Sequence, residues 1–263
     1  MVYQTAKESQ REPTDLEILT AVQRNFGGYF GDFDPTKAFI ETINLRVRKD
    51  ELATSRGLVV EAIRSKREGR YLLLLTKNNV ALRIIQDQGL LDKKRSLVIF
   101  GSSFPHDQQY TQICNTIKRI KLAMEVGHTV VLVNLNNGVL ESLYDALNQY
   151  TVKLGNKEYV DLGLGTHRVK CAVHEDFRLI VVAEDSEARN FPIPLINRLE
   201  KHFLGMETMM DNATHGHTVN ALRDWVAAIC DVRGRRHEMG RNFQKFRPED
   251  VFIGYHGSVA TVD

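Results

Sequence analysis

The sequence has 263 residues and 43% hydrophobic content, which is enough to bury the core of one large domain or two modest ones. It carries 35 lysines and arginines against 33 acidic residues, and the resulting charge of +2 gives no reason to expect nucleic acid or an anionic membrane as a partner. Its three cysteines are far apart and have neither zinc-site nor redox-motif spacing, which favours a reducing compartment.

Helices are predicted in the first part of the chain. Residues 15–24 have the apolar spacing of a short amphipathic helix, with Thr14 as its N-cap and the pair Gly27-Gly28 at its end. Residues 36–68 are also predicted to be helical, apart from a charged interruption in the middle. These helices precede the region where strands begin.

No part of the sequence predicts a membrane segment. The longest apolar runs, at 71–75 and 130–133, are far shorter than the roughly 20 residues that a membrane-spanning helix needs. No segment near the N-terminus resembles a signal peptide. We therefore expect a cytosolic protein without a transmembrane segment.

From residue 71 onward, short apolar runs alternate with segments of helical spacing. Buried strands are predicted at 71–76, 96–100, 130–133 and 177–183, and helices at 80–89, 109–124 and 140–147. Asn137 is a candidate cap of the last of these helices. Four buried strands joined by helices indicate an α/β fold, with a mostly parallel sheet covered by helices on both faces.

Two further features belong to this α/β region and its end. Residues 153–173 predict a β-hairpin inserted before the fourth strand, because turn signals flank its strands. An apolar stripe of helical spacing predicts a helix that continues to Phe203, and another helix is predicted at 219–232. A basic tail at 233–241 follows.

In an α/β fold, the loops at the carboxyl ends of the strands are the default site region. The first loop, TKNNVAL at 76–82, has no glycine and carries Lys77 at its start, so it does not match the GxxxxGK[ST] pattern of a phosphate-binding loop. A plain strand-to-helix turn is favoured there. The loop FGSSFP at 100–105 has one glycine and two hydroxyls, which could accept a phosphate weakly, but a turn is again favoured.

The third strand ends without acidic residues. Asn134 follows it, and a neutral amide cannot replace the charge of a magnesium-binding aspartate. Glu141 lies about two turns into the next helix, too late to orient an attacking water. His167 and His174 have no partner at metal-ligand spacing, so we interpret them as surface or structural residues.

Arg198 lies off the apolar stripe of its predicted helix, so we expect its guanidinium to face outward. One interpretation is a solvated side chain or an ion pair with Glu184, Asp185 or Glu187. The other is an arginine finger, which would stabilise charge on a γ-phosphate bound by a neighbouring subunit or domain.

Several long strings resemble the AAA+ motor core of the mysterin family of giant ATPases and RING-type E3 ubiquitin ligases. They are RNFGG, YLLLLTKNNVAL, FGSSFPHDQQYTQIC, ESLYDALNQY, YVDLGLGTHRVKC, FRLIVVAE and FPIPLINRLEKH, in collinear order over about residues 15–205. The resemblance implies four segments: the end of a preceding helical lid and a linker at 1–34, a helical lead-in at 35–70, an AAA+ core of the P-loop NTPase type at 71–205, and a partial lid and tail at 206–263.

On this template, Lys77, Asn78 and Asn79 stand where the phosphate-binding loop would be, and Asn134 ends the Walker B strand. The resemblance also places Arg198 where many AAA+ proteins have their arginine finger. The lysine of the phosphate-binding loop and the acids of Walker B are both replaced. We therefore predict a degenerate, pseudo-ATPase module without a confidently bound nucleotide or metal of its own, in which Arg198 acts on the preceding module.

The partners implied by the resemblance are neighbouring AAA modules of the same chain and, through the parent chain, the ubiquitin machinery. ATP and magnesium would be bound in neighbouring modules, and zinc in the ligase region of the parent. Two alternatives stay open. One is a nucleotide hydrolase that uses the loop at 101–103 with Asp107, and the other is an adaptor that docks a partner through the basic tail at 233–241.

Overall fold

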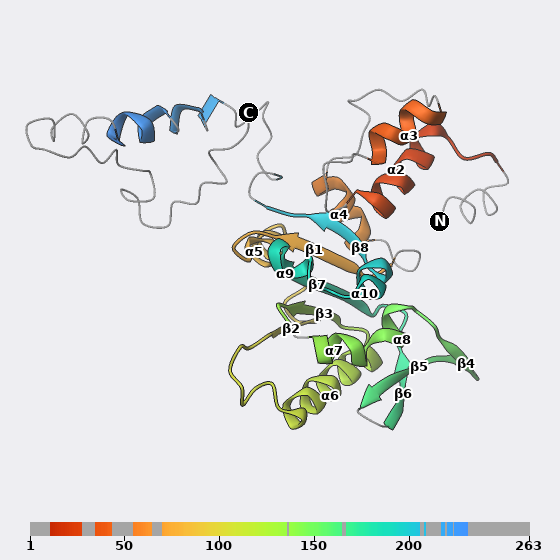
Figure 1. The fold of residues 1–263 in the computed structure, drawn as a ribbon. Helices are drawn as coiled ribbons and strands as arrows, with labels where there is room; N and C mark the ends of the chain where they lie inside the picture. Colours follow the sequence, from red (N-terminus) through yellow and green to blue (C-terminus); the bar gives the residue numbers. More distant parts are fainter. Residues whose placement is uncertain are drawn as a thin grey trace, which may run out of the picture. The chain divides into compact units, whose positions relative to one another are not determined.

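A computed structural model describes residues 11–27, 35–43, 55–64, 70–135, 137–164, 167–205, 208, 217–218, 220–222 and 224–230 (Figure 1). The chain divides into two compact units, residues 1–205 and 206–263. In the second unit, residues 224–230 are helical, and Trp225 lies among them. The basic tail at 233–241 lies outside the described residues. The sheet and the candidate site belong to the first unit.

In the described part of the chain, the helices before the sheet are α2 (Asp15–Phe26), α3 (Pro35–Ile43) and α4 (Ser55–Arg64). The predicted cap of α2 is confirmed, because Thr14 Oγ1 accepts from the Glu17 amide at 3.3 Å while the Glu17 carboxylate accepts from the Thr14 amide at 2.8 Å. This reciprocal capping box satisfies two amides that the helix start leaves open. The expected charged interruption between α3 and α4 lies outside the described residues.

The central sheet has five parallel strands in the order β2-β3-β7-β1-β8. The strands are β1 (Leu72–Thr76), β2 (Ser96–Phe100), β3 (Thr129–Val133), β7 (Arg178–Glu184) and β8 (Glu200–Phe203). The helices between and after them are α5 (Val80–Asp87), α6 (Tyr110–Val126), α7 (Asn137–Ser142), α8 (Tyr144–Leu147), α9 (Asp185–Ala188) and α10 (Ile193–Arg198). The predicted α/β fold and the four predicted strands are confirmed, but β2 lies at the edge of the sheet and is mostly half-buried, so only three of the four are buried as expected.

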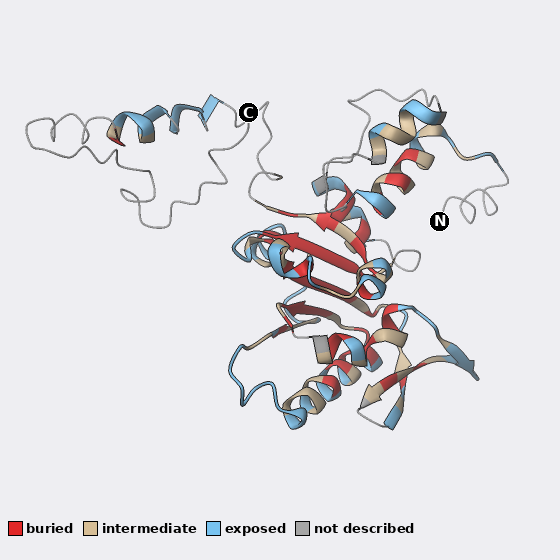
Figure 2. Cartoon of the chain, viewed as in Figure 1, coloured by how far each residue is buried: buried red, intermediate tan, exposed pale blue. Residues whose placement is uncertain are grey.

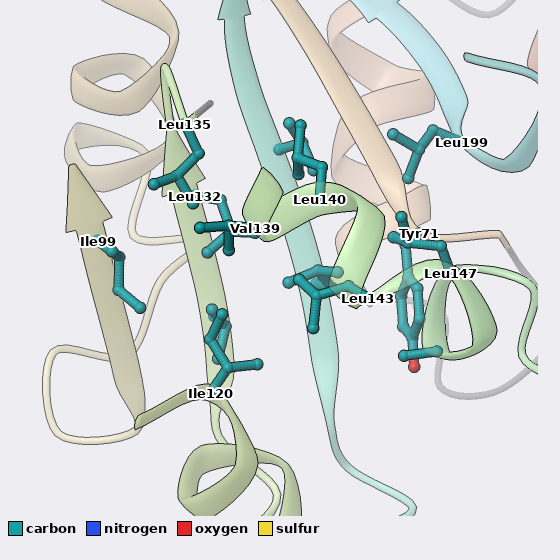
Figure 3. Packing of buried hydrophobic residues seen from close by; sticks show 14 of the residues in the cluster. Tyr71, Ile99, Ile120, Leu132, Leu135, Val139, Leu140, Leu143, Leu147 and Leu199 are labelled. Atoms are coloured by element: carbon teal, nitrogen blue, oxygen red, sulfur yellow. The ribbon is translucent and has the colours of Figure 1, made fainter. Parts of the chain in front are cut away.

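Most residues of the strands in this sheet are buried (Figure 2). Alternate strand residues such as Leu73 and Leu132 join one buried cluster with Leu140 and Leu143 of the segment after β3 (Figure 3). Residues between them in the strands are equally buried but lie outside that cluster, as do the apolar residues of α4 and α5. Because successive strand side chains point to opposite faces, helices cover both faces of the sheet.

The predicted hairpin before the fourth strand is confirmed, with one strand more than expected. It is a three-stranded antiparallel sheet of β4 (Val152–Leu154), β5 (Lys157–Leu164) and β6 (His167–Val173). Gly155, with a φ of 62°, makes the turn between β4 and β5, a conformation that favours glycine. The insertion contacts α6 and α8.

The helix predicted to continue to Phe203 is wrong. Helix α10 ends at Arg198, and Leu199 is extended, with φ −104° and ψ 144°. The chain then forms β8, which pairs with β1: the Glu200 amide donates to the Tyr71 carbonyl at 2.8 Å. Pairing along the exposed side of β1 satisfies its backbone groups, and that gain overrides the local helical spacing.

Buried charged residues join β8 to α2. The Glu200 carboxylate accepts hydrogen bonds from Nε and Nη2 of Arg24 at 2.8 and 3.0 Å, and both side chains are at least 95% buried. His202 Nε2 lies 2.8 Å from the same carboxylate. This cluster ties the helix that the resemblance assigns to a preceding lid to the edge strand of the sheet.

Candidate functional site

The candidate site lies at the carboxyl ends of three neighbouring strands, β3, β7 and β1. After β1, the chain turns through Lys77, Asn78 and Asn79 and enters α5. Asn78 and Asn79 have φ values of 58° and 56°. This is the left-handed region, which asparagine adopts more readily than most residues. Two successive left-handed residues turn their backbone N–H groups toward the end of β7.

Glu184 occupies the position that these N–H groups face. It is the last residue of β7 and is paired in register with Thr76 of β1. Its Oε2 accepts from the Asn78 amide at 3.1 Å, and its Oε1 accepts from the Asn79 amide at 2.6 Å. The carboxylate therefore spans both N–H groups of the turn, in a charge-assisted arrangement.

Thr76 closes the other side of the turn. Its side chain is 1% exposed, and its Oγ1 accepts from the Ala81 amide at 3.1 Å. This bond satisfies one of the amides that the first turn of α5 leaves open, a task that the Asn79 side chain does not perform. The hydroxyl at the end of β1 is therefore used within the fold.

Asn134 connects the end of β3 to the same turn. It has a φ of 49°, and its Nδ2 donates to Asn79 Oδ1 at 2.7 Å. Its backbone amide donates to the Val182 carbonyl at 2.9 Å, which fixes it beside β7. Its Oδ1 is buried and has no hydrogen-bond partner within the described part of the chain. The next side chain, Leu135, is 9% exposed and belongs to the core.

These residues do not fit a magnesium nucleotide. The turn has no glycine, its two N–H groups are taken by Glu184, and Lys77 is exposed. Asn134 offers one neutral oxygen where magnesium binding needs charged ones. Across the residues that the structure describes, no group of three or more His, Cys, Asp or Glu side chains could hold a metal ion.

Arg198 lies in the last turn of α10 and is held by its own chain. Nε donates to Asn148 Oδ1 at 2.5 Å, and Nη1 donates to the Pro194 carbonyl at 2.6 Å. The guanidinium carbon lies 4.6 Å from the ring centroid of Tyr144, so the group stacks on an aromatic face. The side chain is partly exposed rather than fully outward.

The ion pairs considered for Arg198 are not found among the described residues. Glu184 binds the turn after β1, and Asp185 pairs with Arg189 at 3.2 Å, one helical turn away. Glu187 is exposed. The partner of Arg198 is instead a neutral amide, that of Asn148, the C-cap residue of α8.

The loop after β2 forms a compact turn. Ser102 Oγ donates to Asp107 Oδ2 at 2.7 Å and accepts from the Phe104 amide at 3.2 Å. The loop lines one side of an open hollow, whose wall also includes Arg119 of α6. Elsewhere, His174 Nδ1 accepts from the Asp176 amide at 3.1 Å.

The sequence placed Asn79 and Asn134 in separate loops, and the structure brings their side chains together. It did not identify Glu184 as a site residue, because the partners of this carboxylate are backbone amides. The available signal was the Asn-Asn pair at the end of a strand, which favours left-handed backbone and exposed N–H groups.

Residues 61–210 match the family model described as RNF213 AAA domain. The chain belongs to the RNF213 AAA domain family. This confirms the resemblance to mysterin, since RNF213 and mysterin denote the same family. The sheet and its antiparallel insertion are thus those of an AAA domain.

Three relatives of the chain are E3 ubiquitin-protein ligases by name. It is 45% identical over 266 residues to RNF213 of Homo sapiens, 46% over 271 residues to RNF213 of Mus musculus, and 42% over 265 residues to rnf213-beta of Danio rerio. These alignments cover 97%, 97% and 98% of this chain. The chain spans only 5% of the length of each of these RNF213 relatives.

None of the described helices is both long and apolar enough to cross a bilayer.

Proposed function

We propose that this chain is an AAA module that does not hydrolyse ATP and that serves as a structural part of the ring of an RNF213-like E3 ubiquitin ligase. The observation that carries the proposal is the 2.7 Å hydrogen bond from Asn134 to Asn79. Two neutral amides contact each other where hydrolysis needs a cationic phosphate-binding group and an anionic magnesium ligand. Neither residue supplies charge for phosphoryl transfer.

In this proposal, the chemistry belongs to other parts of the longer protein. Neighbouring AAA modules bind ATP and magnesium, and a distant ligase region binds zinc and works with the ubiquitin machinery in the cytosol. The support for this placement is the identity of about 45% with relatives of which this chain matches a small part. The module itself keeps its sheet intact and contributes an ordered ring element.

Arg198 is the residue proposed to act on a neighbour's nucleotide. An arginine finger must be presented in a fixed geometry, and Asn148, Pro194 and Tyr144 hold this guanidinium on three sides. These hydrogen bonds use Nε and Nη1, and Nη2 has no bond to a residue that the structure describes. That nitrogen can donate to a γ-phosphate oxygen of an adjoining module.

Two measurements test the proposal. The 263-residue chain is titrated with MgATP by calorimetry, and we expect neither saturable binding nor hydrolysis above the buffer rate. The full-length parent carrying Arg198→Ala is then assayed for ATPase activity. We expect a fall of about tenfold or more at the site that Arg198 serves, since arginine fingers contribute 10³ to 10⁵ in rate in well-studied cases.

The matched control is Arg189→Ala, which removes an exposed arginine directly after helix α9, together with its ion pair with Asp185. It should leave the ATPase rate of the full-length parent unchanged. If Arg198→Ala also leaves the rate unchanged while the protein stays folded, Arg198 is not a finger. If the 263-residue chain hydrolyses MgATP, the non-hydrolysing module is excluded.

One alternative function has an observation of its own. Ser102 and Asp107 are hydrogen-bonded at the rim of a hollow that Arg119 also lines, which is an arrangement that could engage a phosphate. Saturable, magnesium-dependent ATP binding that is lost in Ser102→Ala would favour this hydrolase. The adaptor alternative depends on the tail at 233–241, which lies outside the described residues.

A further inference from the structure

We propose that the Asn78-Asn79 turn is an oxyanion-binding nest whose resident ligand is the carboxylate of Glu184, held where an external phosphate would otherwise sit. The proposal rests on the assignment of this module as non-hydrolysing, and it names the group that fills the nucleotide position. The chain thus carries its own anion in place of a bound phosphate.

The geometry of the turn supports this assignment. Asn78 and Asn79 are both left-handed, and their successive N–H groups converge on one carboxylate at 3.1 and 2.6 Å. Convergent backbone N–H groups in a turn form a concave site for anions. Helix α5, with eight residues, begins directly after Asn79, and the positive end of its dipole favours negative charge there.

The choice of Glu184 as ligand follows from strand register. Glu184 is directly opposite Thr76, so the β1-β7 pairing fixes its backbone position. Its side chain then needs to reach only the amides two and three residues beyond Thr76. Glu184 is also the N-cap residue of α9, yet its side chain makes no capping bond there. The carboxylate therefore binds across to another element in preference to its own helix.

An intramolecular anion excludes an external one. Because Glu184 is tethered to the sheet, it binds without the loss of translational freedom that a separate phosphate would suffer. A nucleotide would have to displace it, and neither Lys77, which is exposed, nor Asn134, which is neutral, offers compensation. Glu184 is thus a positioning residue for the turn and a barrier to phosphate.

The test is chemical rescue in the variant Glu184→Ala. Its Tm should fall by about 3–10 °C relative to the wild type, because two charge-assisted hydrogen bonds are lost in a domain of this size. Inorganic phosphate, added at constant ionic strength against chloride, should restore about half of this loss, and acetate should act in the same direction. Phosphate stabilises most proteins slightly. The quantity compared is therefore the increase in Tm that phosphate causes in the variant, minus the increase that it causes in the wild type.

Glu187→Ala is the matched control, because it removes an exposed carboxylate three residues away. It should leave the Tm within about 1 °C of the wild type and create no added response to phosphate. A Glu184→Ala protein that responds to phosphate no more than the wild type overturns the proposal. This result is distinct from failure of the proposed function, which would be hydrolysis of MgATP by the wild-type chain.

A second measurement covers the case in which Glu184→Ala does not fold. The isosteric variant Glu184→Gln is compared with the wild type by NMR. The amide proton resonances of Asn78 and Asn79 should both shift, since both amides lose the same charged acceptor. Unchanged resonances for these two amides overturn the proposal.

Discussion

Arg24 and Glu200 form a bidentate ion pair between α2 and β8, with donor–acceptor distances of 2.8 and 3.0 Å. The two residues are 176 positions apart, and both are buried. A third group, Glu61 of α4, lies 3.9 Å from Nη1 of Arg24 but is mostly exposed. The ion pair therefore links α2 directly to the edge strand β8.

Removing one partner of this pair should be strongly destabilising. We predict that Arg24→Met lowers the free energy of unfolding by about 3–5 kcal/mol, because the buried Glu200 carboxylate would lose its bidentate partner and keep His202 as its hydrogen-bonding neighbour. Urea unfolding of the 263-residue chain measures this value. Arg11→Ala is the control, since the Arg11–Glu17 pair is exposed and should contribute less than about 1 kcal/mol. Equal effects of the two substitutions would contradict the prediction.

The buried cluster of Arg24, Glu200 and His202 should make the stability of the fold depend on pH. Burial alone would raise the pKa of Glu200, but hydrogen bonds from His202 and Arg24 outweigh burial and hold the pKa below its ordinary value of 4.5. Arg70, just before β1, also interacts electrostatically with the Glu200 carboxylate. A carboxyl group whose pKa is lowered by folding stabilises the folded state above its ordinary pKa, and this contribution is lost as the pH falls through the lowered value.

Glu200→Gln isolates this contribution. The difference in unfolding free energy between wild type and Glu200→Gln should be constant from pH 7 to about 5 and should shrink as the pH falls below about 4.5. Denaturant unfolding at a series of pH values measures it, with Glu187→Gln as an exposed control. A difference that stays constant down to pH 3 would show that folding leaves the pKa of Glu200 unchanged, and a difference that grows as the pH falls would show that folding raises it.

Much of this fold can be predicted from the sequence because its three inner strands, β3, β7 and β1, are buried on both faces. Runs such as residues 130–133 are continuously apolar, which is typical of parallel strands between two helical layers. Strand β8 could not be found in this way. Its sequence, EKHF, places Glu200 and His202 at buried positions, and their partner Arg24 is far away in the sequence.

The candidate site could be predicted only in part, because some of its features depend on residue type and others on the folded backbone. The loss of charge at Lys77 through Asn79 and at Asn134 is visible in the sequence, since it depends on residue type alone. The ligand role of Glu184 depends on the register of β1 against β7 and on the backbone φ values of the turn. Likewise, the stacking of Arg198 on Tyr144 depends on how α10 ends beside α8.

Gly101 lies so close to the backbone of Asn134 that there is no room for a side chain. Its amide donates to the Val133 carbonyl at 2.7 Å, and a Cβ built on it would overlap the backbone oxygen of Asn134. Because backbone atoms cannot rotate away, we predict that Gly101→Ala costs about 1–3 kcal/mol or more in unfolding free energy. Gly205→Ala, where a Cβ meets open space, should change stability by less than about 0.5 kcal/mol. If Gly101→Ala left the free energy of unfolding unchanged, Gly101 could not lie as close to the Asn134 backbone oxygen as the structure shows.

The cysteines should differ in reactivity. Burial, with a smaller effect of nearby Glu125, raises the pKa of Cys171 to about 11, so its thiolate is scarce near neutral pH. Cys114 on α6 is only partly buried. We expect iodoacetamide at pH 8 to modify Cys114 in the folded chain and Cys171 only after unfolding, as mass spectrometry of peptides can show. Modification of Cys171 at the same rate as Cys114 would contradict the packing of β6 against α6.

The orientation of the Arg198 guanidinium can be tested separately from its presence. If Asn148 and Tyr144 hold the guanidinium for action on a neighbouring nucleotide, then Asn148→Ala should lower kcat of the full-length ATPase by about threefold to tenfold, because a misplaced finger loses part of its effect. KM for ATP should change little, since the finger acts on charge that develops during phosphoryl transfer. Asn115→Ala, on the exposed side of α6, should leave both constants unchanged.

Arg198→Lys tests whether positive charge alone is enough at this position. Lysine keeps the positive charge but lacks the planar fork that bonds Asn148 and a phosphate oxygen together. We expect its kcat to fall nearly as far as that of Arg198→Ala, while its thermal stability stays closer to the wild type because the cation can still lie over Tyr144. Full activity in Arg198→Lys would mean that charge alone suffices, and the hydrogen bond to Asn148 would then have only a structural role.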